Sequence, residues 1–87
     1  MITKKEQGRI EELAYTIRRH IIEMTGVGKA GHIGGSCSAA DLVAALYGWK
    51  MKHDPRRPHW TERDRFIMSK GHAALAQYAA LAEFGYF

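Results

Sequence analysis

The chain has 87 residues, of which 46% are hydrophobic and 25% charged, and its formal net charge is +4 at pH 7. This length allows one domain at most, and the composition excludes disorder throughout. Acidic residues are interspersed among the basic ones without a nucleic-acid motif, so we expect a solvated basic surface and no nucleic-acid partner. No apolar run of membrane length and no signal-peptide pattern occur, which predicts a cytoplasmic protein without a membrane partner. The lone Cys37 excludes an internal disulfide.

The first element expected is a helix that begins near residue 4. Thr3 and Glu6 have the spacing of a capping box, in which a hydroxyl and a carboxylate satisfy the first backbone amides. Gly26 is expected to end the helix as a left-handed cap, and His20 is expected to be a surface cap favoured by the helix dipole. Apolar residues at three- and four-residue steps form one stripe, namely Ile10, Leu13, Ala14, Ile17, Ile21 and Met24.

Five glycines then crowd the stretch 26–38 around His32. Such a cluster predicts a rigid turn that faces a ligand, and the alternative is a flexible linker. A phosphate-binding P-loop is excluded because no strand precedes the glycines and Ala30 replaces the hydroxyl residue that would hold Mg²⁺. A zinc site made of His32, Cys37 and His72 is rejected because their spacing matches no structural site.

A second helix is predicted from Ser38 to about Lys52. The spacing from Ser38 to Asp41 repeats the capping pattern. Its apolar stripe is formed by Leu42, Val43, Leu46 and Tyr47. Gly48 lies inside the helix, where glycine is unfavourable, so it is expected to have a packing reason. Trp49 and Met51 are expected to be buried in the core.

The next segment is expected to be a rigid surface connection, because residues 53–60 contain both prolines. One short turn is predicted at 61–64. Residues 65–69 then indicate a short strand, whose apolar run suits a central parallel strand covered on both faces. The partner strands that it needs do not occur in this sequence.

The third helix is predicted over 73–83, directly after residues 69–72. Its expected apolar face consists of Leu75, Tyr78, Ala79 and Ala82. A strand, a glycine turn and a helix N-terminus together present free backbone amides to an anion. His72, in the first helical turn, would point toward that anion, and the alternative is an imidazole that is hydrogen-bonded locally.

The order and spacing of several motifs resembles the N-terminal part of transketolases, which are thiamine-diphosphate enzymes that move a two-carbon ketol unit between sugar phosphates. The matching segments are Gly31–Ser36, Ser38–Tyr47, Asp54–Pro55, Pro58–Trp60 and Arg63–Ala73. Two histidine motifs about forty residues apart, with an Arg-Asp-Arg-Phe segment between them, make the pattern specific. The Ser-Lys-Gly-His form of the second motif is most similar to the N-terminal subunit of a split transketolase. Deoxyxylulose-phosphate synthases are less similar. The chain departs from the family pattern at Ile33, where proline is usual, and at Cys37, where a larger apolar residue is common.

This resemblance implies an α/β fold, with residues 1–87 as the N-terminal fragment of a single thiamine-diphosphate-binding domain built on a parallel sheet. Within the chain itself it implies three helices and one short strand. His32 would be a catalytic and substrate-binding residue beside the ketol hydroxyls and the reactive thiazolium carbon. His72 would bind the cofactor diphosphate. Lys70 is a weaker candidate for the same anion, and the favoured interpretation of Lys70 is a solvated turn residue. The ligands of Mg²⁺ would lie outside this chain.

The same resemblance implies a sugar-phosphate substrate, a C-terminal transketolase subunit or domain as partner, and a homo- or hetero-oligomer. The chain stops on two aromatic residues just after a helix, so we expect a truncated fragment that is inactive alone. The competing hypothesis is a small helical protein-binding module without catalytic activity. Its docking face would consist of Trp49, Trp60, Tyr78, Tyr86 and Phe87.

Overall fold

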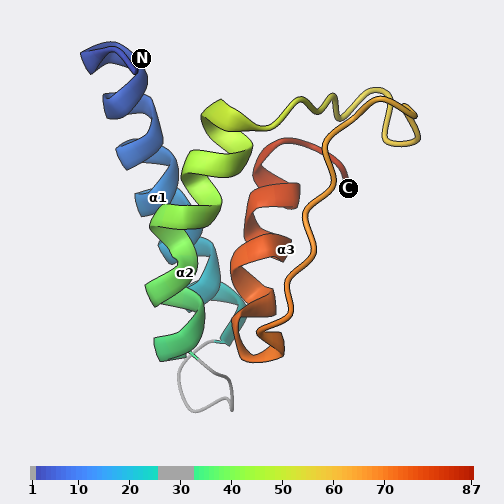
Figure 1. Cartoon of the computed structure of the whole chain (residues 1–87). Coiled ribbons are helices and arrows are strands. Elements are labelled where there is room, and N and C mark those ends of the chain that lie inside the picture. Colours follow the sequence, from blue (N-terminus) through green and yellow to red (C-terminus); the bar gives the residue numbers. More distant parts are fainter. Residues whose placement is uncertain (1, 26–32) are drawn as a thin grey trace.

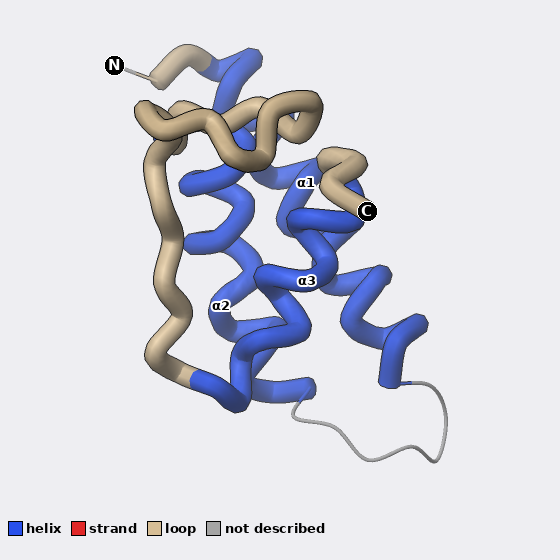
Figure 2. The backbone as a smooth tube through the Cα atoms, turned by 90° about the vertical axis from the view of Figure 1, so that its right-hand side faces the viewer, coloured by secondary structure: helices blue, strands red, loops and turns tan. Residues whose placement is uncertain are grey.

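The computed structural model describes residues 2–25 and 33–87, without the side chains of 33–35 and 72. Three helices pack side by side: α1 (Lys4–Thr25), α2 (Ile33–Ala45) and α3 (Ala74–Glu83) (Figure 1). A π-helical turn, η1 (Leu46–Lys50), continues α2, and a 3-10 turn, η2 (Gly71–Ala73), leads into α3. Figure 2 shows the segment between η1 and η2 running along one side of the helices. The three predicted helices are therefore present.

The start of α1 confirms the predicted capping box. The backbone N–H of Thr3 donates to Glu6 Oε1 at 3.0 Å, and the N–H of Glu6 donates to Thr3 Oγ1 at 3.1 Å. Ile17 and Ile21 of the predicted stripe are fully buried, whereas Met24 is exposed. The helix ends at Thr25, and the predicted glycine cap at residue 26 lies outside the described residues.

The start of α2 corrects the sequence prediction. The helix begins at Ile33, so the predicted cap from Ser38 to Asp41 is wrong and residues 33–38 are helical instead of a turn. The rest of the predicted turn, 26–32, lies outside the described residues. Ser36 in the first turns is fully buried, which shows that this glycine-containing end packs against the other helices. Tertiary packing supplies most helical stability in proteins, and here it offsets the entropy cost of two glycines.

The core forms where the three helices meet, and small residues on α3 let them approach closely. Its fully buried members include Ile17, Ile21, Ala40, Val43, Ala76, Ala79 and Ala80. Besides Met24, other assignments to apolar stripes are wrong, because Leu42 is 66% exposed and Tyr78 is also exposed. Ala82 is exposed as well, since α3 turns Ala76 and Ala80 toward the core.

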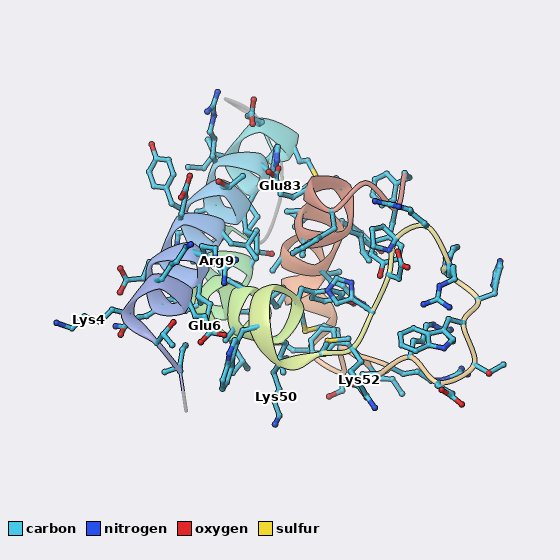
Figure 3. The ribbon with its side chains drawn as sticks, turned by 90° about the horizontal axis from the view of Figure 1, so that it is seen from above. Lys4, Glu6, Arg9, Lys50, Lys52 and Glu83 are labelled. Carbon is cyan, nitrogen blue, oxygen red and sulfur yellow. The ribbon has the colours of Figure 1, made fainter. Side chains whose placement is uncertain are left out.

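Gly48 is needed for close packing, as we expected from a glycine inside a helix. A Cβ placed there would lie 2.9 Å from Leu13 Cδ2, so glycine lets η1 lie close to α1. Met51 packs against the core as expected, but the core position predicted for Trp49 is wrong. The Trp49 ring is partly exposed, and its Nε1 donates to Glu6 Oε2 at 2.9 Å, on the side of α1 that faces η1 (Figure 3). An indole N–H needs an acceptor, and the carboxylate at the helix surface supplies it.

Residues 65–69 do not form the predicted strand. The segment is extended and alternates, with Phe66 and Met68 packed against the core and Ile67 84% exposed. Pairing fails because the described part of the chain contains no other strand. Within the same part, no helix is long and apolar enough to cross a membrane.

Candidate functional site

The N-terminus of α3 is reached through η2, whose backbone is fixed by packing on its inner side. The N–H of Ala73 donates to the carbonyl of Lys70 at 3.0 Å, and Ala73 is fully buried where η2 contacts α2. Lys70 is exposed. The turn is therefore held by the helices behind it while its outer side faces solvent.

The backbone amides at this end have no side-chain cap, although the N–H groups of Ala73 and Ala74 donate to the carbonyls of Lys70 and Gly71. Neither η2 nor α3 has a side-chain cap hydrogen bond. A Cβ placed on Gly71 would meet no atom within 4 Å, so the space directly beside Gly71 is open within the described chain. Uncapped N–H groups and the positive end of the helix dipole favour a phosphate oxygen at such a position. The residues present here fit a diphosphate group.

The two predicted site histidines differ in how far the structure describes them. The backbone of His72 lies in the middle of η2, as the sequence predicted for the start of the third helix. Its side chain, and the whole of His32, lie outside what is described. Ile33, the residue after His32, begins α2 at the end of the bundle where η2 lies (Figure 1).

His20 lies at the surface of α1 and links this helix to α3. Its Nε2 is 2.9 Å from Glu83 Oε2 on α3, and its Nδ1 is 3.4 Å from Glu23 Oε1. Among residues 2–25 and 33–87, no three His, Cys, Asp or Glu side chains are grouped as they would be around a metal ion.

An ion pair between α1 and α2 was not predicted. Arg18 Nη2 donates to Asp41 Oδ2 at 2.8 Å, and Nη1 donates to Oδ1 at 3.3 Å. The hydrogen bonds from this guanidinium lower the pKa of Asp41, and the carboxylate raises the pKa of Arg18. The paired residues are 23 positions apart, so no local sequence signal could indicate the contact.

His53 forms a second unpredicted link, between η1 and the last residues of the chain. Its Nε2 is 2.6 Å from the carbonyl oxygen of Tyr47, and its Nδ1 is 2.7 Å from the hydroxyl of Tyr86. Because a carbonyl oxygen only accepts, Nε2 carries a proton, and in the neutral ring Nδ1 accepts from the Tyr86 hydroxyl. The edge of the ring meets Phe84 with centroids 5.0 Å apart. Burial raises the pKa of Tyr86.

Comparison with known proteins identifies the class to which this fold and site belong. The family described as "Transketolase, thiamine diphosphate binding domain" matches residues 10–87. The chain therefore belongs to the transketolase family, in its N-terminal, thiamine-diphosphate-binding part. This confirms the resemblance carried by the two histidine motifs.

Individual relatives include subunits of divided enzymes as well as longer proteins. The chain is 47% identical over 83 residues to a 6-deoxy-6-sulfo-D-fructose transketolase subunit, SqwG, of Clostridium sp. (strain MSTE9), covering 95% of this chain and 30% of that protein. It is 44% identical over 69 residues to an apulose-4-phosphate transketolase subunit of Phocaeicola vulgatus, covering 79% and 25%. It is 43% identical over 74 residues to the transketolase of Treponema pallidum, covering 85% and 11%. The chain thus spans less than a third of each of these relatives.

Proposed function

We propose that residues 1–87 are the N-terminal part of a single thiamine-diphosphate-binding domain, in a transketolase-type enzyme that transfers a two-carbon ketol unit between sugar phosphates. The observation that carries this proposal is the open, uncapped N-terminus of η2 and α3 in a chain of this family. A cofactor diphosphate needs backbone N–H donors and a positive helix end, and this turn offers both.

Two histidines have different roles in the proposed site. His72 donates a hydrogen bond to the diphosphate beside the amides of η2. His32 lies next to the donor sugar, orients its hydroxyls and moves protons. When bound, thiamine diphosphate supplies the reactive thiazolium carbon. The proposal is supported by the packing of η2 against α2, because the first residue of α2 follows His32 directly.

The remaining parts of the site belong to segments that this chain does not contain. We propose that these segments supply the Mg²⁺ ligands, the partner strands of a parallel sheet and a C-terminal subunit or domain that completes the active centre. The extended segment 65–69 supports the proposed sheet, because its side chains alternate between the core and solvent, as those of a strand do, and Ile67 is exposed. The assembly would be a homo- or hetero-oligomer, and the chain alone would not turn over a sugar phosphate.

The competing protein-binding module has less support. Its proposed docking face included Trp49 and Tyr86, but these side chains are hydrogen-bonded to Glu6 and His53 within the chain. Trp49, Tyr78 and Phe87 are exposed, so the enzyme is favoured by the family match and not by burial of this face.

A chimaera tests the proposed function in a complete enzyme. In the Treponema pallidum transketolase, the segment that matches this chain would be replaced by the matching residues of this chain. Ketol transfer between sugar phosphates by the chimaera would then be measured. We expect activity. We expect His72→Ala to raise the thiamine diphosphate concentration for half-maximal activity about tenfold, since it removes a hydrogen bond to a charged group. We expect His32→Ala to lower kcat at least about a hundredfold.

The matched control is His59→Ala, because His59 is exposed in the 53–63 loop. It should change neither the cofactor requirement nor kcat. An active chimaera in which His72→Ala leaves the cofactor requirement unchanged, or in which His32→Ala retains full turnover, would contradict the proposed roles.

A further inference from the structure

A cavity of about 250 Å³ lies under the 53–63 loop, beside η1 and the last residues of the chain. Its lining includes the apolar residues Tyr47, Phe66 and Leu81 and the charged residues Arg63, Asp64 and Arg65. The loop that borders it lies at the opposite end of the bundle from η2 (Figure 1). It is therefore separate from the diphosphate site proposed above.

The walls of this cavity are fixed by hydrogen bonds. The N–H of Lys52 donates to Asp64 Oδ2 at 2.8 Å, and the N–H of Asp64 donates to the carbonyl of Lys52 at 2.8 Å, which closes the base of the loop. On the other side, His53 binds the Tyr86 hydroxyl and the Tyr47 carbonyl. Small-molecule sites are usually formed before the ligand arrives, and this cavity meets that condition.

The lining carries more positive than negative charge. Arg63 donates one hydrogen bond, from Nη1 to the carbonyl of Trp60 at 3.0 Å, so most of its N–H groups have no partner in the described chain. Arg65 is exposed and forms no ion pair or hydrogen bond with the described residues. Asp64 is the only acidic residue in the described lining, and its carboxylate already accepts the Lys52 amide. Two guanidinium groups beside one carboxylate leave the lining with a net positive charge, which favours an anion.

We propose that this cavity binds a small amphipathic anion, with one apolar ring or short chain against Tyr47, Phe66 and Leu81 and a phosphate or carboxylate group at Arg63 and Arg65. Guanidinium groups bind such oxygens through paired hydrogen bonds. Pockets for drug-sized ligands measure about 300–1,000 Å³, so this smaller cavity suits a smaller ligand with roughly one ring. This site is separate from the proposed diphosphate site, but it shares Arg65 and Phe66 with the segment that we propose joins a sheet, so the partner strands must leave the mouth of the cavity open.

The probe for the test is phenyl phosphate, which combines one ring with one anionic group. The 87-residue chain would be labelled with ¹⁵N, and its backbone amide signals would be followed during titration. We expect saturable shifts at Arg65, Phe66 and Tyr86 with a Kd of about 1 mM. Inorganic phosphate and phenol, each offering half of the ligand, should both bind at least about tenfold more weakly.

Two arginine variants separate the cavity from general surface charge. Arg65→Gln should weaken phenyl phosphate binding about tenfold, because it removes a charge-assisted hydrogen bond at an exposed position where folding is not at risk. Arg19→Gln, on the exposed surface of α1, should leave the affinity unchanged. Unsaturable shifts, equal binding of inorganic phosphate or phenol, or equal loss in both variants would overturn the proposal.

Discussion

Two isoleucines on α1 allow a direct test of where the core lies. Ile17 is fully buried at the contact of the helices, whereas Ile22 is 58% exposed on the same helix. Replacing either by alanine changes helix propensity equally, so the difference between the variants reports burial alone. Ile17→Ala removes three carbon atoms, worth roughly 2.5 kcal/mol of transfer free energy, and the cavity left behind adds to this.

We therefore expect Ile17→Ala to lower the free energy of unfolding by about 3 kcal/mol, and Ile22→Ala to change it by less than about 0.5 kcal/mol. Urea denaturation followed by circular dichroism measures both values. For a domain of this size, about 1 kcal/mol shifts Tm by roughly 4–8 °C, so thermal unfolding should separate the variants by more than about 10 °C. Equal losses in the two variants would refute this packing of α1.

Three further predictions follow from single contacts. Asp41→Asn should cost about 0.2–1 kcal/mol at pH 7 by breaking the exposed pair with Arg18. The pKa of Asp41 lies below its ordinary value of 3.8. The difference in unfolding free energy between the parent chain and the variant should therefore be constant above pH 3.8 and disappear as the pH falls through the lowered pKa. Urea denaturation at a series of pH values measures it. Gly48→Ala should gain less than the roughly 1 kcal/mol expected from helix propensity, and a Leu13→Ala background, which removes the clashing methyl, should restore the gain; a full gain in both backgrounds would show that the contact is absent. Thr3→Ala should cost about 1 kcal/mol of unfolding free energy by removing the capping box, and no loss in the same denaturation assay would contradict its role.

Local patterns predicted the helices well, because a capping box and apolar periodicity are decided within a few residues. The Thr3 to Glu6 cap and the buried Ile17 and Ile21 belong to this class. The start of α2 was missed because its glycine-rich first turns become helical through packing against the other helices. The extended segment 65–69 was predicted to be a strand from composition, but pairing depends on partners that composition cannot supply.

Family motifs predicted more of the candidate site than physical arguments about its individual residues did. The glycine at residue 71 and the helix that follows were enough to indicate an anion-binding turn, and the structure has an uncapped turn there. The long-range links made by Arg18 and His53 left no signal in the sequence, because both partners must be brought together by the fold. The cavity under the 53–63 loop depends on the same kind of contact and was missed for the same reason.

The proposed site requires His32 and His72 to converge at the end of the bundle where α2 and η2 begin. The most direct measurement is cross-linking of a His32→Cys, His72→Cys variant, made in a Cys37→Ser background, with a short bismaleimide. A control variant pairs His32→Cys with His59→Cys, whose loop lies at the opposite end of the bundle (Figure 1). We predict an intramolecular cross-link in the first variant and none in the control. Failure of the first pair to cross-link, while each of its cysteines reacts with a monomaleimide, would contradict the account.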